Sequence, residues 1–178
     1  MLKKNNVIVQ FNEANFNIIK KYCKKYDFTN ISKFLKRSEC IKTYSEKEYK
    51  YLEPWIQWYS FYTNDSYKKH RVFHLDNSTS KKKETFCSKL SIKKKIGIFC
   101  SMNIPKNSKY NIYIPDPWST NSSDKSLSSQ FVYKAIKQIV NTNSKMKISI
   151  SSIIGIIIMI GFPKNMKDIN LLYDFFIS

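Results

Sequence analysis

Residues 52–76, LEPWIQWYSFYTNDSYKKHRVFHLD, constrain the fold of this chain most strongly, because they concentrate its aromatic side chains. The stretch holds two of the three Trp, five further aromatic residues and both His, His70 and His74. Packing in a core is the usual role of such side chains. The stretch also holds a carboxylate, Glu53, directly before Pro54, and a polar turn at residues 63–66. We therefore predict that any chemistry of this chain is located here.

The length and composition are those of one folded domain, or of the larger part of one. Of the 178 residues, 42% are hydrophobic and 15% are aromatic, which supplies a core and excludes a disordered chain. Only 3 residues are Gly, against a usual share of about 7%. Sharp turns must therefore be made by Asn, Asp, Ser and Pro.

A formal net charge of +18 is compatible with a nucleic acid or an anionic membrane as partner. The basic residues are almost all Lys, since the only Arg are Arg37 and Arg71. Surfaces that bind phosphate groups generally use more Arg, whose planar fork binds them bidentately. The abundance of Lys together with Asn, Ile, Tyr and Phe is also what an AT-rich genome produces at tolerant surface positions. Both interpretations of the charge stay open.

The four Cys show no metal-binding or disulfide pattern. Cys23, Cys40, Cys87 and Cys100 form no C-x-x-C pair, and no His stands at zinc-finger spacing. The N-terminal residues lack the apolar segment of a secretory signal. We expect reduced thiols and a cytoplasmic protein.

The first predicted elements form a strand followed by a helix. The apolar, β-branched residues 7–11 predict a buried strand, and Asn15 is placed to cap a helix that begins at Phe16. A strand, a polar loop and a helix in this order form the first βα unit of an open α/β sheet. Ligands bind beyond the carboxyl ends of such strands, so Asn12 and Glu13 are candidate site residues.

Further elements continue the α/β pattern. We predict helices at residues 30–37 and from Pro54, which suits a first helical turn, and another over residues 86–92. Apolar runs at residues 95–100 and 110–114 predict two more strands, and polar residues follow them, as they follow the first strand. The fold class is therefore α/β with a mostly parallel sheet flanked by helices. The turn at residues 115–120, PDPWST, holds Trp118 in a fixed place.

Composition changes after residue 120, and we predict a division into residues 1–120 and 121–178. Residues 121–129 form a polar linker, and residues 130–141 an amphipathic helix. Residues 148–162 are nearly all apolar but fall short of the roughly 20 residues that span a bilayer. A buried helix, a contact face for another segment and a membrane anchor are the alternatives. The sequence ends within an apolar helical pattern, which suggests a truncated chain.

Two patterns together resemble a known family. One is the apparent strand, polar position and helix in VIVQFNEANFNII; the other is E-P-W-x-Q-W followed by Thr63 and His70 and then by V-F-H-L. They resemble the N-terminal half of the alkaline phosphatase superfamily, in its type I phosphodiesterase/nucleotide pyrophosphatase-like branch, where a T-G-x-x-P-x-x-H-G segment follows the nucleophile helix. The segment ETFCSKLSIKKKIGIFCSMN resembles a helix–strand unit of that branch, and PDPWST is similar to a turn in its uncharacterised bacterial members. The resemblance covers about residues 5–120.

The resemblance implies a hydrolase of phosphate esters that uses divalent metal ions, Zn or Mn. It places Asn12 and Glu13 at a metal with Glu53 near them, and it gives Glu53, Thr63 and His70 as candidate catalytic residues. For His70 the alternative is a motif histidine that braces its loop. The nucleophile of the family is a Thr or Ser, and no hydroxyl stands at its place near Glu53. The further metal ligands of the family include His residues, and no His follows His74.

The sequence thus predicts a metal-dependent phosphatase- or phosphodiesterase-like protein, incomplete or inactive as a hydrolase, with phosphate esters as its substrate class. A basic nucleic-acid-binding module is one alternative. A membrane-associated protein anchored by residues 148–162 is the other.

Overall fold

The computed structural model describes residues 6–12, 14–41, 43–80, 83–141 and 149–160. The chain forms two compact units, Met1–Ser45 and Glu46–Ser178. The division predicted at residue 120 stays a prediction. Among the described helices, none has both the length and the apolar character needed to cross a membrane.

The first unit contains two helices, α1 (Phe16–Tyr26) and α2 (Thr29–Arg37). The Asn15 side chain accepts hydrogen bonds from the backbone N–H groups of Asn17 and Ile18, at 3.0 and 3.1 Å. This confirms the predicted cap, which satisfies two N–H groups that a helix start leaves without partners. The helix predicted at residues 30–37 is also confirmed, as α2.

The buried strand predicted at residues 7–11 is wrong. These residues form no ladder, and their side chains are exposed, 81% for Val7 and 72% for Phe11. A strand needs a neighbouring strand for its backbone groups, and the elements described in this unit are helices. The first βα unit is therefore absent from the described structure.

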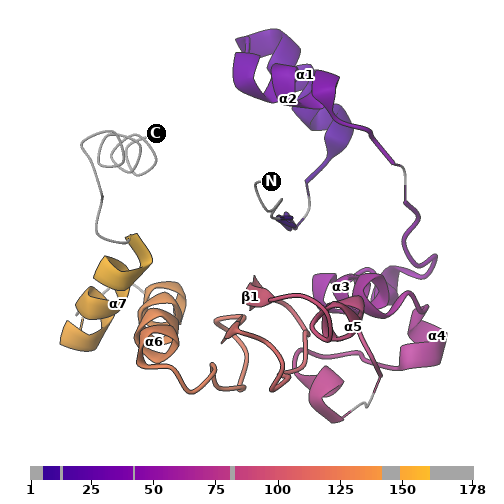
Figure 1. Ribbon diagram of the computed structural model, residues 1–178. Coiled ribbons are helices and arrows are strands. Elements are labelled where there is room, and N and C mark those ends of the chain that lie inside the picture. Colours follow the sequence, from indigo (N-terminus) through magenta and orange to yellow (C-terminus); the bar gives the residue numbers. More distant parts are fainter. Residues whose placement is uncertain (1–5, 13, 42, 81–82, 142–148, 161–178) are drawn as a thin grey trace. The chain divides into compact units, whose positions relative to one another are not determined.

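The second unit is a mixed α/β structure (Figure 1). Its two strands, β1 (Gly97–Ser101) and β2 (Ile112–Pro115), form a parallel pair in which Gly97 lies opposite Ile112. Its α-helices are α3 (Pro54–Thr63), α4 (Tyr67–His70), α5 (Phe86–Leu90), α6 (Leu127–Asn141) and α7 (Ile150–Ile160), with short 3-10 turns at Tyr49–Tyr51 and Asn77–Ser80. The α/β class and the parallel pairing of the last two predicted strands are thus confirmed.

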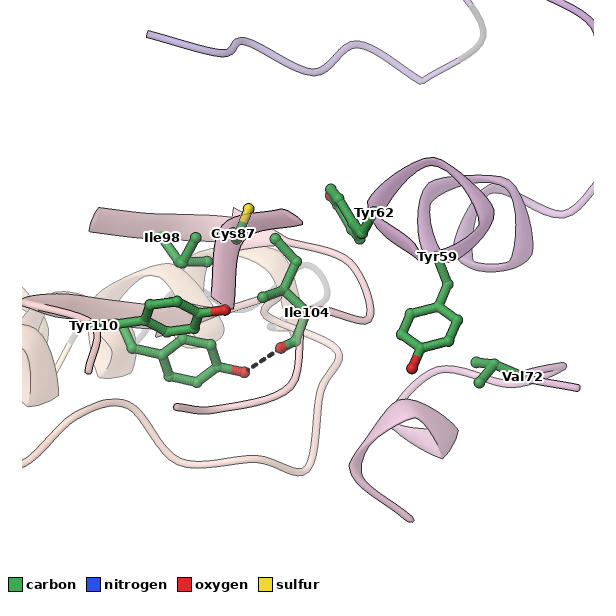
Figure 2. Packing of buried hydrophobic residues seen from close by; sticks show 8 residues of the cluster. Tyr59, Tyr62, Val72, Cys87, Ile98, Ile104 and Tyr110 are labelled. Atoms are coloured by element: carbon green, nitrogen blue, oxygen red, sulfur yellow. Dashed lines mark hydrogen bonds between the residues drawn. The ribbon is translucent and has the colours of Figure 1, made fainter. Parts of the chain in front are cut away.

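The aromatic stretch at residues 52–76 forms much of the core. Pro54 opens α3, as predicted. Figure 2 shows Tyr59, Tyr62 and Val72 with Ile98 and Ile104, which belong to one buried cluster with Cys87, Tyr110 and Tyr113. The hydroxyl of Tyr113 donates to the carbonyl of Ile104 at 2.8 Å, so the core also satisfies a buried polar group.

Helix α6 packs against β2. Ile114 of β2 packs against Val132 and Tyr133 of α6, and the Tyr133 hydroxyl donates to the carbonyl of Ser119 at 3.0 Å. Helix α7 then packs along α6 (Figure 1). The predicted helical character of the C-terminal segment is confirmed for its described residues.

Candidate functional site

A pocket of about 340 Å³ lies where residues beyond β1 and β2 meet the start of α3. Its walls are formed by Trp55, His74, Leu75, Met102 and Trp118. Met102 follows β1 and Trp118 follows β2, so the pocket is at the carboxyl ends of two parallel strands, where open α/β sheets bind ligands. Its walls are mainly apolar and carry two indole rings, and its volume is at the lower end of the range of about 300–1,000 Å³ for small-molecule sites.

Asn103 joins the segments around this pocket. Its side-chain amide donates to the carbonyl of Trp55 at 3.0 Å and to that of His74 at 3.2 Å. Its side-chain oxygen accepts the backbone N–H of Asp76 at 2.7 Å. Asn103 is buried, and burial without these bonds would cost roughly 1–3 kcal/mol per polar group. Asn103 therefore holds the beginning of α3 and the end of the aromatic stretch against β1.

Asp76 connects the end of the aromatic stretch to the segment that follows β2. Its carboxylate accepts hydrogen bonds from the Ser119 hydroxyl at 2.5 Å, from the N–H and hydroxyl of Thr120 at 2.6 and 2.9 Å, and from the Asn121 amide at 2.7 Å. Hydrogen bonds to an ionised acceptor are among the strongest in proteins. The turn that carries Trp118 is thus fastened to residue 76.

The backbone around the pocket is strained at three positions. Asp76, Cys100 and Asn103 have φ values of 68°, 50° and 55°, although none of them is Gly. The remaining non-Gly residues described with positive φ, Asp27, Asn64 and Arg71, end helices, where this conformation is common. The left-handed region costs an L-residue about 1–2 kcal/mol. Strain of this kind gathers at ligand sites, where the surrounding contacts fix it.

The turn after β2 contains a buried carboxyl group, Asp116. Its side chain accepts the backbone N–H of Trp118 at 3.0 Å, and a turn is present here as predicted. Burial raises the pKa of Asp116, and the nearby Asp76 carboxylate raises it further. Trp118 itself is 58% exposed. Its indole therefore presents a large surface to a ligand at the edge of the pocket.

Cys100 lies inside β1, where the register with β2 shifts between Phe99 and Ser101. Burial, and then the charge of Asp116, raise the pKa of Cys100 to about 11. A thiol is nucleophilic as its thiolate. Cys100 therefore stays protonated at neutral pH and acts as a core residue.

His70 is buried at the end of α4 and links that helix to α3. Its Nδ1 accepts the backbone N–H of Val72 at 3.0 Å, and its Nε2 lies 2.8 Å from the hydroxyl of Ser60. Because Nδ1 accepts, the proton of the neutral ring is on Nε2, which donates to Ser60. Burial lowers the pKa of His70, and the charge of Lys83 lowers it further. The ring is therefore neutral near pH 7.

The other predicted site residues are spread over both units. The Thr63 hydroxyl donates to the carbonyl of Tyr59, one turn back in α3, at 2.8 Å. Glu53 is exposed at the start of α3 and makes no side-chain cap there. Asn12 lies in the first unit, so the structure does not define a common site for Asn12 and the residues of the second unit. Glu13 lies outside the described residues.

Metal-ligating side chains do not gather in the described residues, where no group of three or more His, Cys, Asp or Glu could hold a metal ion. Asn12 could offer a neutral amide oxygen. A site for Zn or Mn at Asn12 and Glu13 stays a prediction from the family resemblance.

Two residues that organise the pocket, Asp76 and Asn103, are absent from the predicted site. Asn103 could have been found, because it follows a predicted strand as Asn12 follows residues 7–11. Asp76 gives a weaker signal, because its partners are more than forty residues further along the chain. Comparison with protein-family models, characterised proteins and solved structures gave no match. The described structure therefore shows an α/β unit with a pocket at the carboxyl ends of its two parallel strands.

Proposed function

We propose that this chain is a phosphoric-ester-hydrolase-like domain that binds a phosphate ester beside Trp55 and Trp118 without hydrolysing it. One observation supports this proposal above the others. Three of the segments that carry the family resemblance, E-P-W, C-S-M-N and P-D-P-W-S-T, meet at the pocket through the hydrogen bonds of Asn103 and Asp76, whereas the fourth, at residues 7–19, lies in the first unit. Segments distant in the chain thus come together where an α/β hydrolase of this class would bind its substrate.

The side chains available argue for binding without turnover. A phosphoryl-transfer nucleophile of this family is a hydroxyl, and the expected place holds the Glu53 carboxylate. The Thr63 hydroxyl is used by the helix backbone. His70 has its Nδ1 occupied and its Nε2 protonated, so the neutral ring offers no free lone pair to a general base. Thr63 and His70 instead support the α3–α4 region.

The test measures binding and turnover separately. Phenyl phosphate is titrated into the full chain by calorimetry, and release of p-nitrophenolate from bis(p-nitrophenyl) phosphate is followed with added Zn²⁺ or Mn²⁺. We expect saturable binding of phenyl phosphate and no release above the protein-free control. Trp118→Ala should weaken binding about tenfold, since an aromatic stack contributes about 1–3 kcal/mol. The matched control is Tyr49→Ala, which removes an aromatic ring that is 90% exposed.

Two results would overturn the two parts of the proposal. Absence of phenyl phosphate binding at millimolar concentration, with and without metal, would refute the phosphate-ester assignment. Stoichiometric metal binding accompanied by turnover that disappears in Glu13→Ala would refute the inactive assignment.

A second pocket, of about 400 Å³, is lined in part by Lys83 and Lys106, and the contacts of these lysines give the nucleic-acid alternative little support. Lys83 pairs with Asp65 at 2.5 Å, and the Lys106 ammonium donates to the carbonyls of Ser122 and Ser123. Ammonium groups held by the protein in this way are poorly placed to contact a phosphate chain. Nucleic-acid binding stays a prediction, and its test is an affinity that falls steeply with salt.

A further inference from the structure

Helix α7 packs on α6 through its small side chains. Ser152 is buried, and a Cβ atom added at Gly155 would collide with the carbonyl of Phe131 and lie 2.8 Å from the Cβ of Ala135. The two helices can approach this closely because residue 155 is Gly. The close approach of α7 to α6 is therefore made at small residues, Ser152 and Gly155.

Hydrogen bonds fix the rotation of α7 about its own axis. The side-chain oxygen of Gln138, in α6, accepts from the backbone N–H and the hydroxyl of Ser149 at 3.2 and 3.0 Å, and it also accepts from the hydroxyl of Ser152. The Ser149 hydroxyl in turn accepts the backbone N–H of Ser152 at 3.2 Å, which caps the helix start. Turning the helix about its axis would break these bonds.

The fixed rotation directs a row of isoleucines away from α6. Their spacing of three and four residues places them along one face of the helix, and they are between 37% and 78% exposed. We call Ile150, Ile153, Ile154, Ile157 and Ile158 the isoleucine stripe. A helix on the surface of a soluble protein normally turns its apolar face to the core. Among the described residues, helix α7 does the reverse, and a contiguous exposed apolar surface marks an interaction site.

The charge of the chain decides which occupant suits the stripe. The net charge is +18, carried almost entirely by Lys. Self-association through the stripe would bring two such chains together against their mutual repulsion. An anionic lipid surface would instead gain about 1 kcal/mol for each Lys close to it, while the stripe removes its apolar area from water.

We propose that the α6–α7 pair is a membrane-surface contact in which the isoleucine stripe enters the headgroup region of an anionic bilayer. The eleven residues of α7 extend about 16 Å at 1.5 Å per residue, half the hydrocarbon thickness of about 30 Å. Such a helix lies along the surface with its apolar side about 5–10 Å deep. This inference is independent of the phosphate-ester proposal, because it uses another part of the second unit.

The experiment is flotation of the full chain with vesicles of phosphatidylcholine alone or with 30 mol% phosphatidylserine. We expect partition into the anionic vesicles that decreases as NaCl is raised, because salt screens the charge contribution. The double variant Ile154→Ser/Ile157→Ser should reduce partition about tenfold or more, since the apolar burial is lost. The matched control Ile8→Ser/Ile41→Ser changes two exposed isoleucines of the first unit and should leave partition unchanged.

Circular dichroism of each variant checks that it folds, and sedimentation velocity measures self-association. Equal partition into neutral and anionic vesicles would overturn the proposal, as would equal partition of the stripe variant and the wild type. Self-association that is lost in the stripe variant, without vesicle binding, would assign the stripe to a second copy of the chain and refute the membrane assignment.

Discussion

Replacing Asp76 by Asn, Gly and Ala separates the two physical roles of this residue at the pocket. Its carboxylate accepts four hydrogen bonds from residues 119–121, and its backbone has a φ of 68°. Asn keeps one acceptor oxygen and tolerates the left-handed conformation. Gly removes all four bonds but relieves the backbone, and Ala removes the bonds while keeping the strain.

The expected losses follow from these contacts. A hydrogen bond to a charged group contributes about 1.5–3 kcal/mol and a neutral one about 0.5–1.5 kcal/mol. The four bonds to Asp76 contribute less than four separate bonds would, because they share two oxygen atoms and Thr120 is exposed to solvent. We expect the free energy of unfolding to fall by about 1–2 kcal/mol for Asp76→Asn and by about 3 kcal/mol for Asp76→Gly. For Asp76→Ala we expect a free energy of unfolding about 0.5–1 kcal/mol below that of Asp76→Gly. The left-handed penalty for Ala is about 1–2 kcal/mol, and the smaller entropy of the unfolded Ala variant offsets part of it.

Urea unfolding followed by Trp fluorescence measures these differences, since all three Trp lie in the second unit. The control pair is Asn64→Gly and Asn64→Ala, at a left-handed position in the same unit that ends α3. The difference in free energy of unfolding between these two variants measures the backbone penalty alone. The Asp76 variants report the loss of the hydrogen bonds as well. A loss below about 0.5 kcal/mol for Asp76→Gly, with an unchanged urea dependence, would show that the network does not stabilise the pocket.

Three further outcomes are expected. Gly155→Ala should lower the melting temperature seen by circular dichroism, because a collision that costs about 1–3 kcal/mol outweighs the helix propensity of about 1 kcal/mol that Ala adds; an unchanged or higher melting temperature would contradict the close approach of α6 and α7. Because burial, and then the charge of Lys83, lower the pKa of His70 below 6.5, the unfolded chain takes up a proton first as the pH falls. Stability should therefore be full above pH 6.5 and decrease below it, towards the lower pKa of the folded state; urea unfolding of His70→Gln should show a shallower decrease, and an equal slope would exclude His70 as its source. A thiol reagent at pH 8 should modify the exposed Cys40 first, whereas Cys87 and Cys100, whose pKa values burial raises to about 11, should react only after urea is added; rapid reaction of all thiols in the native chain would contradict their burial.

The sequence predicted the elements whose signals are local. Asn15 caps α1 and Pro54 begins α3 as expected, because a cap or a helical proline acts on backbone groups within one turn. The strand predicted at residues 7–11 failed for the opposite reason. A β-branched run describes a segment able to join a sheet, while its partner strand must come from elsewhere in the chain.

The pocket was predictable only in part. The polar ends of β1 and β2 and the fixed Trp118 could be read from strand patterns and from the PDPWST turn. The role of Asp76 depends on residues 119–121, and no local pattern couples positions so far apart. Composition likewise showed that residues 148–162 are apolar, but the outward direction of the isoleucine stripe depends on Gln138 and Gly155.

The contact between Ser60 and His70 shows why residue types alone do not define a catalytic site. A Ser hydroxyl 2.8 Å from a His Nε2 resembles an activated nucleophile with its base. Here the backbone N–H of Val72 donates to Nδ1, so the ring proton is on Nε2, and the Ser60 hydroxyl donates to the carbonyl of Ile56 at 3.1 Å. Both hydrogen bonds therefore have the direction opposite to the one that catalysis requires. Nε2 of the ring donates to the Ser60 hydroxyl, and this hydroxyl donates to the backbone of α3. Moving the ring proton to Nδ1 would break the hydrogen bond that the buried Val72 donates. The contact between Ser60 and His70 therefore serves to hold α4 against α3.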